Sequence, residues 1–210
     1  MKEKNSKIPA YLTDNSWEKE LNHKLWITKG ARFEANARLK EKASLSNMSL
    51  AFISSYLIII NLMPLFFPSY EIDSNIINFF TTSLAILLLV YTQIESSNEY
   101  KLNAHLFHSC SLKISNLYND LRIAKEIEVK AEKDKKIMEI TNKYKEILSS
   151  YENHEPIDTE MFKSKNLDYY ELEKSFVIVA NYKYYLMVKL KYHLLIILPA
   201  TLFLIMILDI

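Results

Sequence analysis

The sequence has 210 residues, with 26 basic and 25 acidic side chains, a formal net charge of +1, one cysteine and one glycine. The balanced charge argues against direct nucleic-acid binding, which normally requires a concentrated basic surface. The lone Cys110 excludes an intramolecular disulfide framework and is consistent with a reducing compartment. Because one glycine leaves few positions for tight hairpin turns, the composition predicts an all-α fold.

Residues 1–42 are predicted to form a loose N-terminal arm followed by a basic amphipathic helix. They contain no apolar core of the length that a secretory signal peptide needs. A glycine in the middle of this helix permits a close contact or a bend. We predict that the helix lies on or leads into the membrane surface, through Trp26, Lys29, Arg32, Phe33 and Arg38. The alternative is a soluble amphipathic helix packed on the rest of the cytosolic part.

Residues 43–94 are predicted to form a transmembrane helical hairpin. No charged side chain lies between Lys42 and Glu71, and a second uncharged window ends just before Glu95. About 20 helical residues cross the roughly 30 Å hydrocarbon layer, so each window is long enough. Two buried core helices are the alternative, but a chain of this length offers little material to surround them.

The distribution of Lys and Arg around the hairpin predicts its orientation. Residues 24–43 carry six of them, residues 95–114 carry two, and the turn 68–73 carries none. Because cytoplasmic flanks are enriched in Lys and Arg, the turn is expected outside the cell. The N-terminus and residues 95–191 are therefore expected in the cytoplasm.

Polar residues recur at helical spacing inside both apolar windows. They are Asn47, Ser54 and Asn61 in the first helix, and Asn75, Asn78 and Thr82 in the second. Unpaired polar groups are unfavourable in hydrocarbon, so these side chains must face protein or water. One interpretation is interhelical packing and hydrogen bonding. The other is a water-filled path in an oligomer, with apolar residues such as Ile58, Leu62, Leu87 and Val90 as a dewetting constriction.

Residues 95–167 are predicted to form long cytosolic amphipathic helices and a loop, with the second membrane helix continuing as a rod. Apolar residues recur there at spacings of three and four, as in a coiled coil. This seam consists of Tyr100, Ala104, Phe107, Cys110, Ile114, Leu117, Leu121 and Ala124, and resumes at Ile137, Ile140, Tyr144, Ile147 and Tyr151. Residues 152–166 are predicted to be a loop or a broken helix around Pro156.

Residues 168–210 are predicted to form a C-terminal helix that starts near Asn166 or Asp168, where Glu171 would complete a capping box. Residues 192–208 contain no Asp, Glu, Lys or Arg. This stretch is short for a membrane span, but nearby lysines can extend it by reaching to the interface. We predict a third transmembrane helix here. A helix that docks on the first two inside an oligomer is the alternative.

No recognisable catalytic signature is present. One glycine cannot build a phosphate-binding loop, and neither a GxSxG elbow nor a paired-cysteine zinc motif occurs. His105, His108 and Cys110 come closest to a metal site, but the cysteine projects away from the face that the histidines share. The sequence therefore predicts a protein that is not an enzyme, with no catalytic residues, no cofactor and no metal.

The stretch LWITKGARFEANARLK, residues 25–40, leads directly into the hairpin and then into a long cytosolic helix. This arrangement resembles the SLATT family, the SMODS and SLOG-associating two-transmembrane effectors of bacteria. The most specific part of the likeness runs from Trp26 to Arg38. The C-terminal apolar segment fits the subgroup often associated with reverse transcriptases and departs from the plain two-span pattern.

The resemblance implies an effector of an antiviral conflict system in the bacterial inner membrane. Its partners would be the lipid bilayer, further copies of the chain, and a nucleotidyltransferase or reverse transcriptase system from a defence operon. Once triggered, such effectors are thought to oligomerise and permeabilise the membrane. The alternative function is a non-conducting, membrane-anchored scaffold that recruits a soluble partner through its cytosolic helices.

Overall fold

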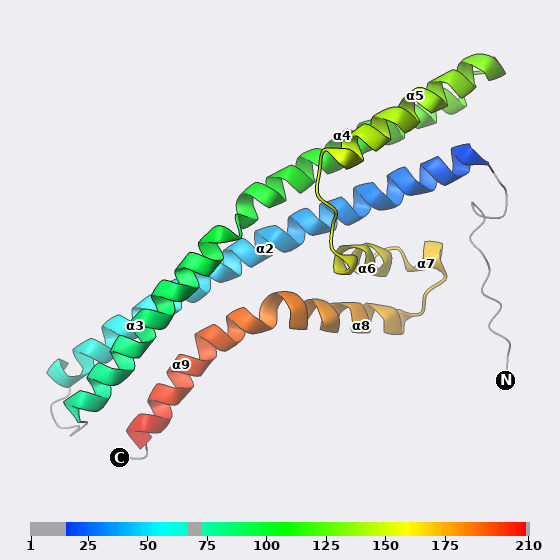
Figure 1. Ribbon diagram of the computed structural model, residues 1–210. Coiled ribbons are helices and arrows are strands. Elements are labelled where there is room, and N and C mark those ends of the chain that lie inside the picture. Colours follow the sequence, from blue (N-terminus) through cyan, green and yellow to red (C-terminus); the bar gives the residue numbers. More distant parts are fainter. Residues whose placement is uncertain (1–15, 67–72, 209–210) are drawn as a thin grey trace. The chain divides into compact units, whose positions relative to one another are not determined.

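The computed structural model describes residues 16–66 and 73–208, and the side chains of those residues up to 205. Within these ranges every regular element is a helix, which confirms the all-α prediction (Figure 1). All but the last residue of the predicted N-terminal arm, residues 1–16, and all but the last residue of the predicted outer turn, residues 68–73, lie outside the described residues. The chain divides into two compact units.

The helical unit comprises Met1–Ala37 and Ala104–Val177, and the hairpin unit comprises Arg38–Asn103 and Ile178–Ile210. Helix α2, Trp17–Phe66, contributes its first part to the helical unit and its second part to the hairpin unit. Its 50 residues continue through Pro64 without a break. The basic helix and the first predicted membrane helix are therefore one continuous element.

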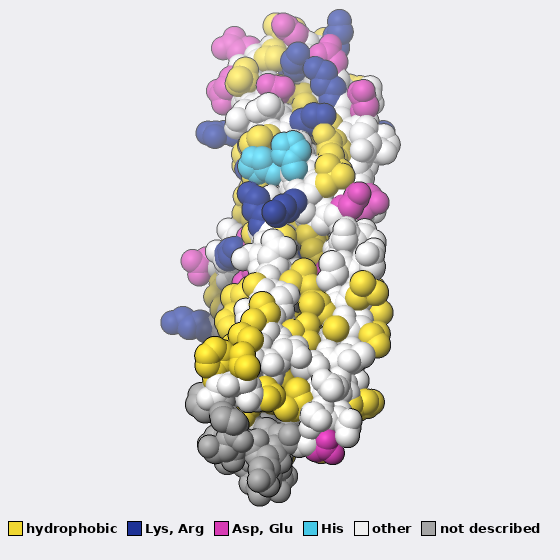
Figure 2. Space-filling view, turned by 90° about the vertical axis from the view of Figure 1, so that its left-hand side faces the viewer, with side chains coloured by type: hydrophobic (Ala, Val, Ile, Leu, Met, Phe, Trp, Pro, Cys, Tyr) yellow, Lys and Arg dark blue, Asp and Glu magenta, His cyan; other side chains and the backbone are white. Residues whose placement is uncertain are grey.

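The hairpin unit contains three helical segments that are long and apolar enough to cross a membrane by length and composition. They lie in α2, in α3 (Ser74–Ser97), and in the run formed by α8 (Lys174–Tyr184), the π-helix η1 (Tyr185–Lys189) and α9 (Leu190–Leu208). Large apolar side chains remain exposed along all of them, and Figure 2 shows apolar side chains gathered over this unit. Exposed apolar surface of this extent is typical of a protein that contacts lipid.

The second membrane helix does not continue as an unbroken rod. Helix α3 ends at Ser97, and α4 (Tyr100–Lys125) begins after two intervening residues. The Asn98 side chain donates to the Ile94 carbonyl at 3.0 Å, and Glu99 adopts a positive φ of 45°. A side chain that bonds the preceding turn competes with the helical backbone, which explains the break at this point.

The helical unit forms its core from the predicted seam. After α4, the chain turns back into α5 (Lys130–Ser149), and both helices pack on Leu21 and Leu25 of α2. The buried seam residues are Ala104, Phe107, Cys110, Ile114, Leu117, Leu121, Ala124, Ile137, Ile140 and Tyr144, with Ile147 and Tyr151 partly buried. The seam prediction is confirmed for these positions, and its apolar face is occupied within the chain.

Residues 152–166 include a helix, α6 (Pro156–Ser164), which starts with proline at its first turn. The carboxylate of Asp158 accepts from the Glu155 backbone N–H at 2.9 Å and completes a capping box. The predicted C-terminal helix is interrupted near its start. The four-residue α7, Leu167–Tyr170, is followed by Glu171 as its C-cap, with a φ of 51°. The predicted role of Glu171 at the start of the helix is therefore wrong.

Candidate functional site

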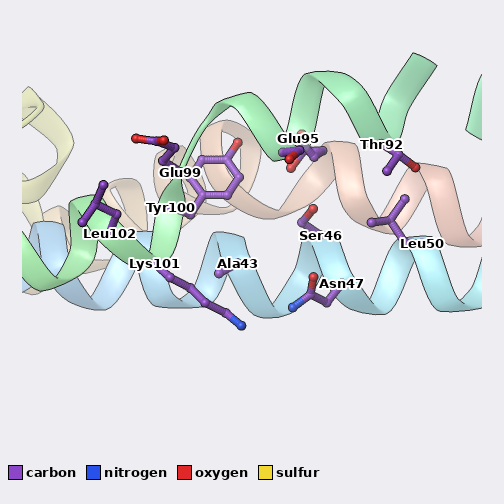
Figure 3. Close-up of a pocket in the computed structure, with 11 residues that line it drawn as sticks. Ala43, Ser46, Asn47, Leu50, Thr92, Glu95, Glu99, Tyr100, Lys101 and Leu102 are labelled. Carbon is purple, nitrogen blue, oxygen red and sulfur yellow. The ribbon is translucent and has the colours of Figure 1, made fainter. Parts of the chain in front are cut away.

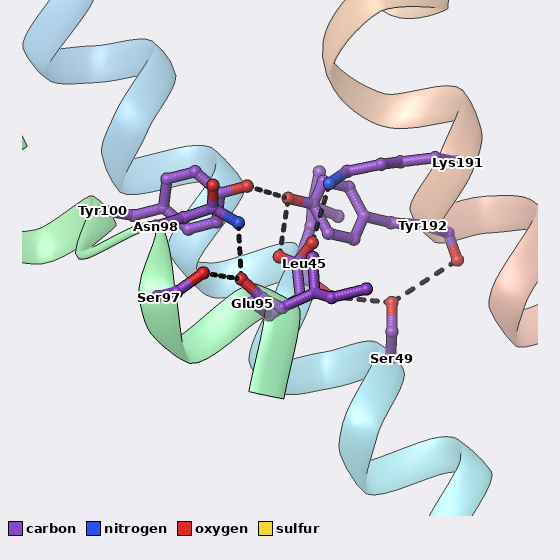
Figure 4. Close-up of polar contacts among 9 residues, drawn as sticks. Leu45, Ser49, Glu95, Ser97, Asn98, Tyr100, Lys191 and Tyr192 are labelled. Carbon is purple, nitrogen blue, oxygen red and sulfur yellow. Dashed lines mark hydrogen bonds and ion pairs between the residues drawn. The ribbon is translucent and has the colours of Figure 1, made fainter. Parts of the chain in front are cut away.

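A buried carboxylate, Glu95, lies in the last turn of α3 and is the centre of a polar cluster in the hairpin unit (Figure 4). Lys191 Nζ donates to Glu95 Oε1 at 2.8 Å, and the Tyr192 hydroxyl donates to Glu95 Oε2 at 3.1 Å. The Tyr192 hydroxyl also lies 3.4 Å from that of Tyr100. We call Glu95, Lys191, Tyr192 and Tyr100 the Glu95 cluster.

The position of Glu95 follows from the periodicity of α3. The residues of this helix that the hairpin unit buries are Ile77, Thr81, Leu84 and Glu95. Their spacings place all four on one face of the helix, so Glu95 occupies a position that would otherwise carry an apolar side chain. A buried carboxylate is unfavourable unless it is paired and hydrogen-bonded. Both requirements are met by residues that begin the C-terminal helix.

A serine on α2 contacts the same point of the C-terminal helix. Ser49 is fully buried, and its hydroxyl donates to the Leu45 carbonyl at 2.8 Å. It also lies 3.4 Å from the backbone carbonyl of Tyr192. Contact at this distance between a small side chain and a backbone carbonyl allows close packing of the two helices, as in many membrane proteins.

A second ion pair lies at the start of the hairpin unit. Lys189 Nζ is 2.6 Å from Glu41 Oε1, and the Tyr184 hydroxyl donates to Glu41 Oε2 at 2.7 Å. Partial burial acts to raise the pKa of the Glu41 carboxyl. The hydrogen bonds from Lys189 and Tyr184 outweigh this effect, so the pKa falls below the ordinary value of 4.5. The carboxylate is therefore ionised at neutral pH.

A pocket of about 400 Å³ opens beside Glu95 (Figure 3). It is lined by Ala43, Ser46, Asn47 and Leu50 of α2, and by Thr92, Glu95, Ser96, Glu99, Tyr100, Lys101 and Leu102. Of the charged lining residues, Glu95 is already paired with Lys191, which leaves the Glu99 carboxylate and the single ammonium group of Lys101. Phosphate groups are normally bound by several cationic side chains or helix N-termini. The pocket is therefore poorly suited to a nucleotide messenger.

The six predicted polar residues are mostly exposed on the hairpin. Asn61, Asn75, Asn78 and Thr82 are exposed, as is Asn47 at the rim of the pocket. Ser54 is half-buried and donates to the carbonyl of its own preceding turn at 2.8 Å. The faces of the hairpin that are buried instead carry Ser46, Ser49, Ile53, Ile60, Ile77, Thr81 and Leu84. A pore-lining or interhelical role of the six residues in an oligomer stays a prediction.

Arg32, a residue of the predicted membrane-surface helix, is fully buried in the helical unit. Its guanidinium donates to the Glu152 carbonyl and lies 5.3 Å from the Phe107 ring centroid. Burial of the thiol raises the pKa of Cys110, and the nearby Arg32 guanidinium counteracts part of this rise. Arg38 is also buried, in the hairpin unit.

The other residues of the predicted membrane-surface helix contact protein as well. The Trp26 ring lies 4.5 Å from that of Tyr169, centroid to centroid, and Lys29 Nζ lies 4.6 Å from the centroid of the Tyr118 ring. The ring of Phe33 packs edge-on against His108. These contacts agree with the alternative of a helix packed on other helices. A membrane-surface role of these residues stays a prediction.

The described residues contain no group of three His, Cys, Asp or Glu side chains that could hold a metal ion. Sequence reasoning missed the Glu95 cluster because Glu95 was treated only as the end of an apolar window. The spacing of Glu95 from Leu84 and Thr81 was the available signal, since it places the carboxylate on their face of α3.

The family model described as SMODS and SLOG-associating 2TM effector domain family 5 matches residues 14–205. No curated protein and no solved structure matches the chain.

Proposed function

The chain belongs to family 5 of the SMODS and SLOG-associating 2TM effector domains, and from this premise we propose that it permeabilises the bacterial inner membrane in response to infection. In this proposal the protein is an effector of an antiviral conflict system. It is inactive until a partner or second messenger triggers it, and it then oligomerises in the membrane.

The observation that carries the proposal is the outward position of polar side chains on the hairpin. Asn61 of α2 and Asn75, Asn78 and Thr82 of α3 are exposed on helices that otherwise present large apolar residues. The Asn61 amide donates to the Leu57 carbonyl at 2.7 Å, and the Asn61 side chain is exposed. In hydrocarbon such polar groups need hydrogen-bond partners from protein or water. An oligomer that turns these faces inward supplies both.

The trigger is proposed to reach the effector through another protein. The lining of the pocket beside Glu95 carries one cationic side chain, Lys101, which argues against direct capture of a phosphate-bearing messenger at that place. A nucleotidyltransferase or reverse transcriptase system encoded nearby would instead detect infection and act on the helical unit. In the proposed orientation the helical unit is cytoplasmic and the turn at residues 68–73 lies outside the cell.

A non-conducting scaffold is the second candidate function. The coiled-coil seam is buried within the helical unit, so a soluble partner would have to bind other residues. Large apolar side chains outside the seam are exposed on α4 and near its end, among them Leu112, Ile123 and Val129. Exposed apolar residues of this kind are what a partner-binding surface would require.

Reconstitution in dye-loaded lipid vesicles tests the proposal, with the native neighbouring proteins and a lysate of phage-infected cells added to supply the trigger. The full chain is compared with the double variant Asn61→Leu, Thr82→Leu. The matched control is Ser55→Leu, since Ser55 is also exposed and also donates to its own preceding turn, but lies about 120° around α2 from Asn61. Dye release by the full chain and the control, but not by the double variant, supports the proposal. Equal dye release by all three proteins would show that the polar faces do not contribute to permeabilisation.

A further inference from the structure

The C-terminal helix contacts both helices of the hairpin at separate points. Tyr192 meets Ser49 of α2 and Glu95 of α3, and the ring of Phe203 lies 6.2 Å from that of Phe80, centroid to centroid. The family name describes two transmembrane segments, whereas the described residues contain three candidate spans. The third apolar helix lies within the residues that the family model matches, and it packs on the two-helix hairpin.

The two side chains of the Glu95–Lys191 ion pair are buried to different extents. The Glu95 side chain is 4% exposed, whereas the Lys191 side chain is 47% exposed. If α9 moves away, Lys191 can keep its charge in water. Glu95 would lose its ammonium partner and its hydrogen bond from Tyr192 together, and an unpaired buried carboxylate is strongly unfavourable. Departure of α9 therefore leaves Glu95 without its two partners, and the hairpin has to rearrange so that the carboxylate gains other donors.

We propose that Glu95, Lys191 and Tyr192 form an autoinhibitory latch, through which α9 holds the hairpin in its closed arrangement until the effector is triggered. This inference rests on the proposed permeabilising function. Release of α9 uncovers Ser49 on α2 and the residues around Phe80 on α3, and it makes these faces available to a second copy. A device of this kind has two discrete packings, and the trigger shifts the population between them.

The ion pair between Glu41 and Lys189 marks the start of the segment that moves when the latch opens. Glu41 binds Lys189 and Tyr184, which lie at the π-helix and just before it. π-helical turns in α-helices are frequent at functional sites, where they change the phase of the side chains that follow. In the latch, the Glu41 contacts hold the start of this segment while Lys191 and Tyr192 hold the start of α9.

Charge exchange tests the latch in cells. We compare Glu95→Lys, Lys191→Glu and the double exchange by membrane-potential dye after induction without any trigger. The single variants place like charges together and should depolarise cells, while the double exchange restores the pair and should return them toward the wild-type potential. Tyr192→Phe, which removes only the hydroxyl, is the milder variant in case a charge reversal prevents folding. Lys136→Glu, in an exposed ion pair of α5, is the control.

A thiol cross-link provides a readout that does not depend on conduction. In a Cys110→Ser background, Phe80→Cys and Phe203→Cys are joined by a short bifunctional maleimide. The latch predicts efficient cross-linking in the wild type and the control, several-fold less in the single variants and in Tyr192→Phe, and recovery in the double exchange. Unchanged cross-linking in every variant that inserts into the membrane would overturn the latch.

The membrane potential of wild-type cells that carry the native neighbouring genes is measured in parallel under phage challenge. If the challenged wild type depolarises but the single variants lose cross-linking and keep their potential, α9 is not autoinhibitory and the inference is overturned. If the challenged wild type keeps its potential, the proposed permeabilising function fails instead, and the autoinhibitory role fails with it. The cross-linking arm then reports separately whether the ion pair holds α9.

Discussion

Gly30 lies against the ring of Phe162, and a Cβ at position 30 would overlap that ring. The contact attaches α6 to α2 in the helical unit. The Trp26 ring, 4.8 Å from that of Phe162 between centroids, lies on the same side. The single glycine of the chain is therefore placed where a close approach of two helices requires it.

Gly30→Ala is expected to destabilise the protein despite the better helix propensity of alanine. Propensity alone would stabilise α2 by about 1 kcal/mol. Overlap with a packed ring typically costs about 1–3 kcal/mol, so the net sign should be unfavourable. Thermal unfolding of the detergent-solubilised protein measures the change. Phe162→Leu in the same chain should recover part of the loss, and a stabilised Gly30→Ala variant would contradict the packing.

Arg32→Met is expected to loosen the segment around Glu152. The guanidinium donates to the Glu152 carbonyl, and Asn153 Oδ1 lies 3.5 Å from its second terminal nitrogen. Loss of a hydrogen bond from a charged group typically costs about 1.5–3 kcal/mol. Limited proteolysis in residues 152–155 should become faster. Lys29→Met, which removes a cation from the same helix but leaves this bond, serves as the control, and equal cleavage in both variants would exclude the role of Arg32.

The stability of the helical unit should depend on the protonation of His23. Burial of the ring, and secondarily the charge of Lys163, lower the pKa of His23 below 6.5. The folded state disfavours the proton, so this contribution is complete above about pH 6.5 and is lost as the pH falls through the lowered pKa. The Nδ1 atom of His23 lies 2.9 Å from the Tyr169 hydroxyl, within hydrogen-bond distance.

The measurement is the unfolding midpoint at about pH 7.5 and about pH 5.5. The wild type should lose more stability on acidification than His23→Gln, which cannot titrate. His105→Gln provides the control, since the His105 side chain is exposed. An identical acid response of the wild type and His23→Gln would show that His23 does not contribute to it.

If the third candidate span crosses the membrane, Lys130 and the C-terminal end of the chain lie on opposite sides of it. A cysteine at Lys130, at the start of α5, should be protected from a membrane-impermeant maleimide in intact cells. A tag fused after Ile210 should be accessible from outside if α9 crosses the bilayer. Accessibility of both, or protection of both, would contradict a third span, and labelling after cell lysis controls for reactivity.

Local patterns in the sequence predict much of this fold, because those patterns have local physical causes. Apolar windows of sufficient length predict the hairpin, and spacings of three and four predict the buried seam from Ala104 to Ala124. The break after α3 was missed because neither glycine nor proline marks it. It arises from the Asn98 side chain and the left-handed conformation of Glu99.

The candidate site was missed because its partners are distant in sequence. Lys191 and Glu95 are 96 residues apart, and nothing in the local pattern of either predicts the other. Arg32 was similarly counted as a surface cation because its acceptor, the Glu152 carbonyl, is a backbone atom 120 residues further along. Charged residues are seldom fully buried, so composition alone predicts exposure for both groups.

The central claim is that the hairpin permeabilises the membrane through its polar faces. The most direct measurement is the membrane potential of phage-infected cells that carry the full chain with its native neighbouring genes. The account predicts rapid depolarisation after infection with the wild type and Ser55→Leu, and strongly reduced depolarisation with the inserted double variant Asn61→Leu, Thr82→Leu. A membrane potential that persists throughout infection in wild-type cells would contradict the account and favour the non-conducting scaffold.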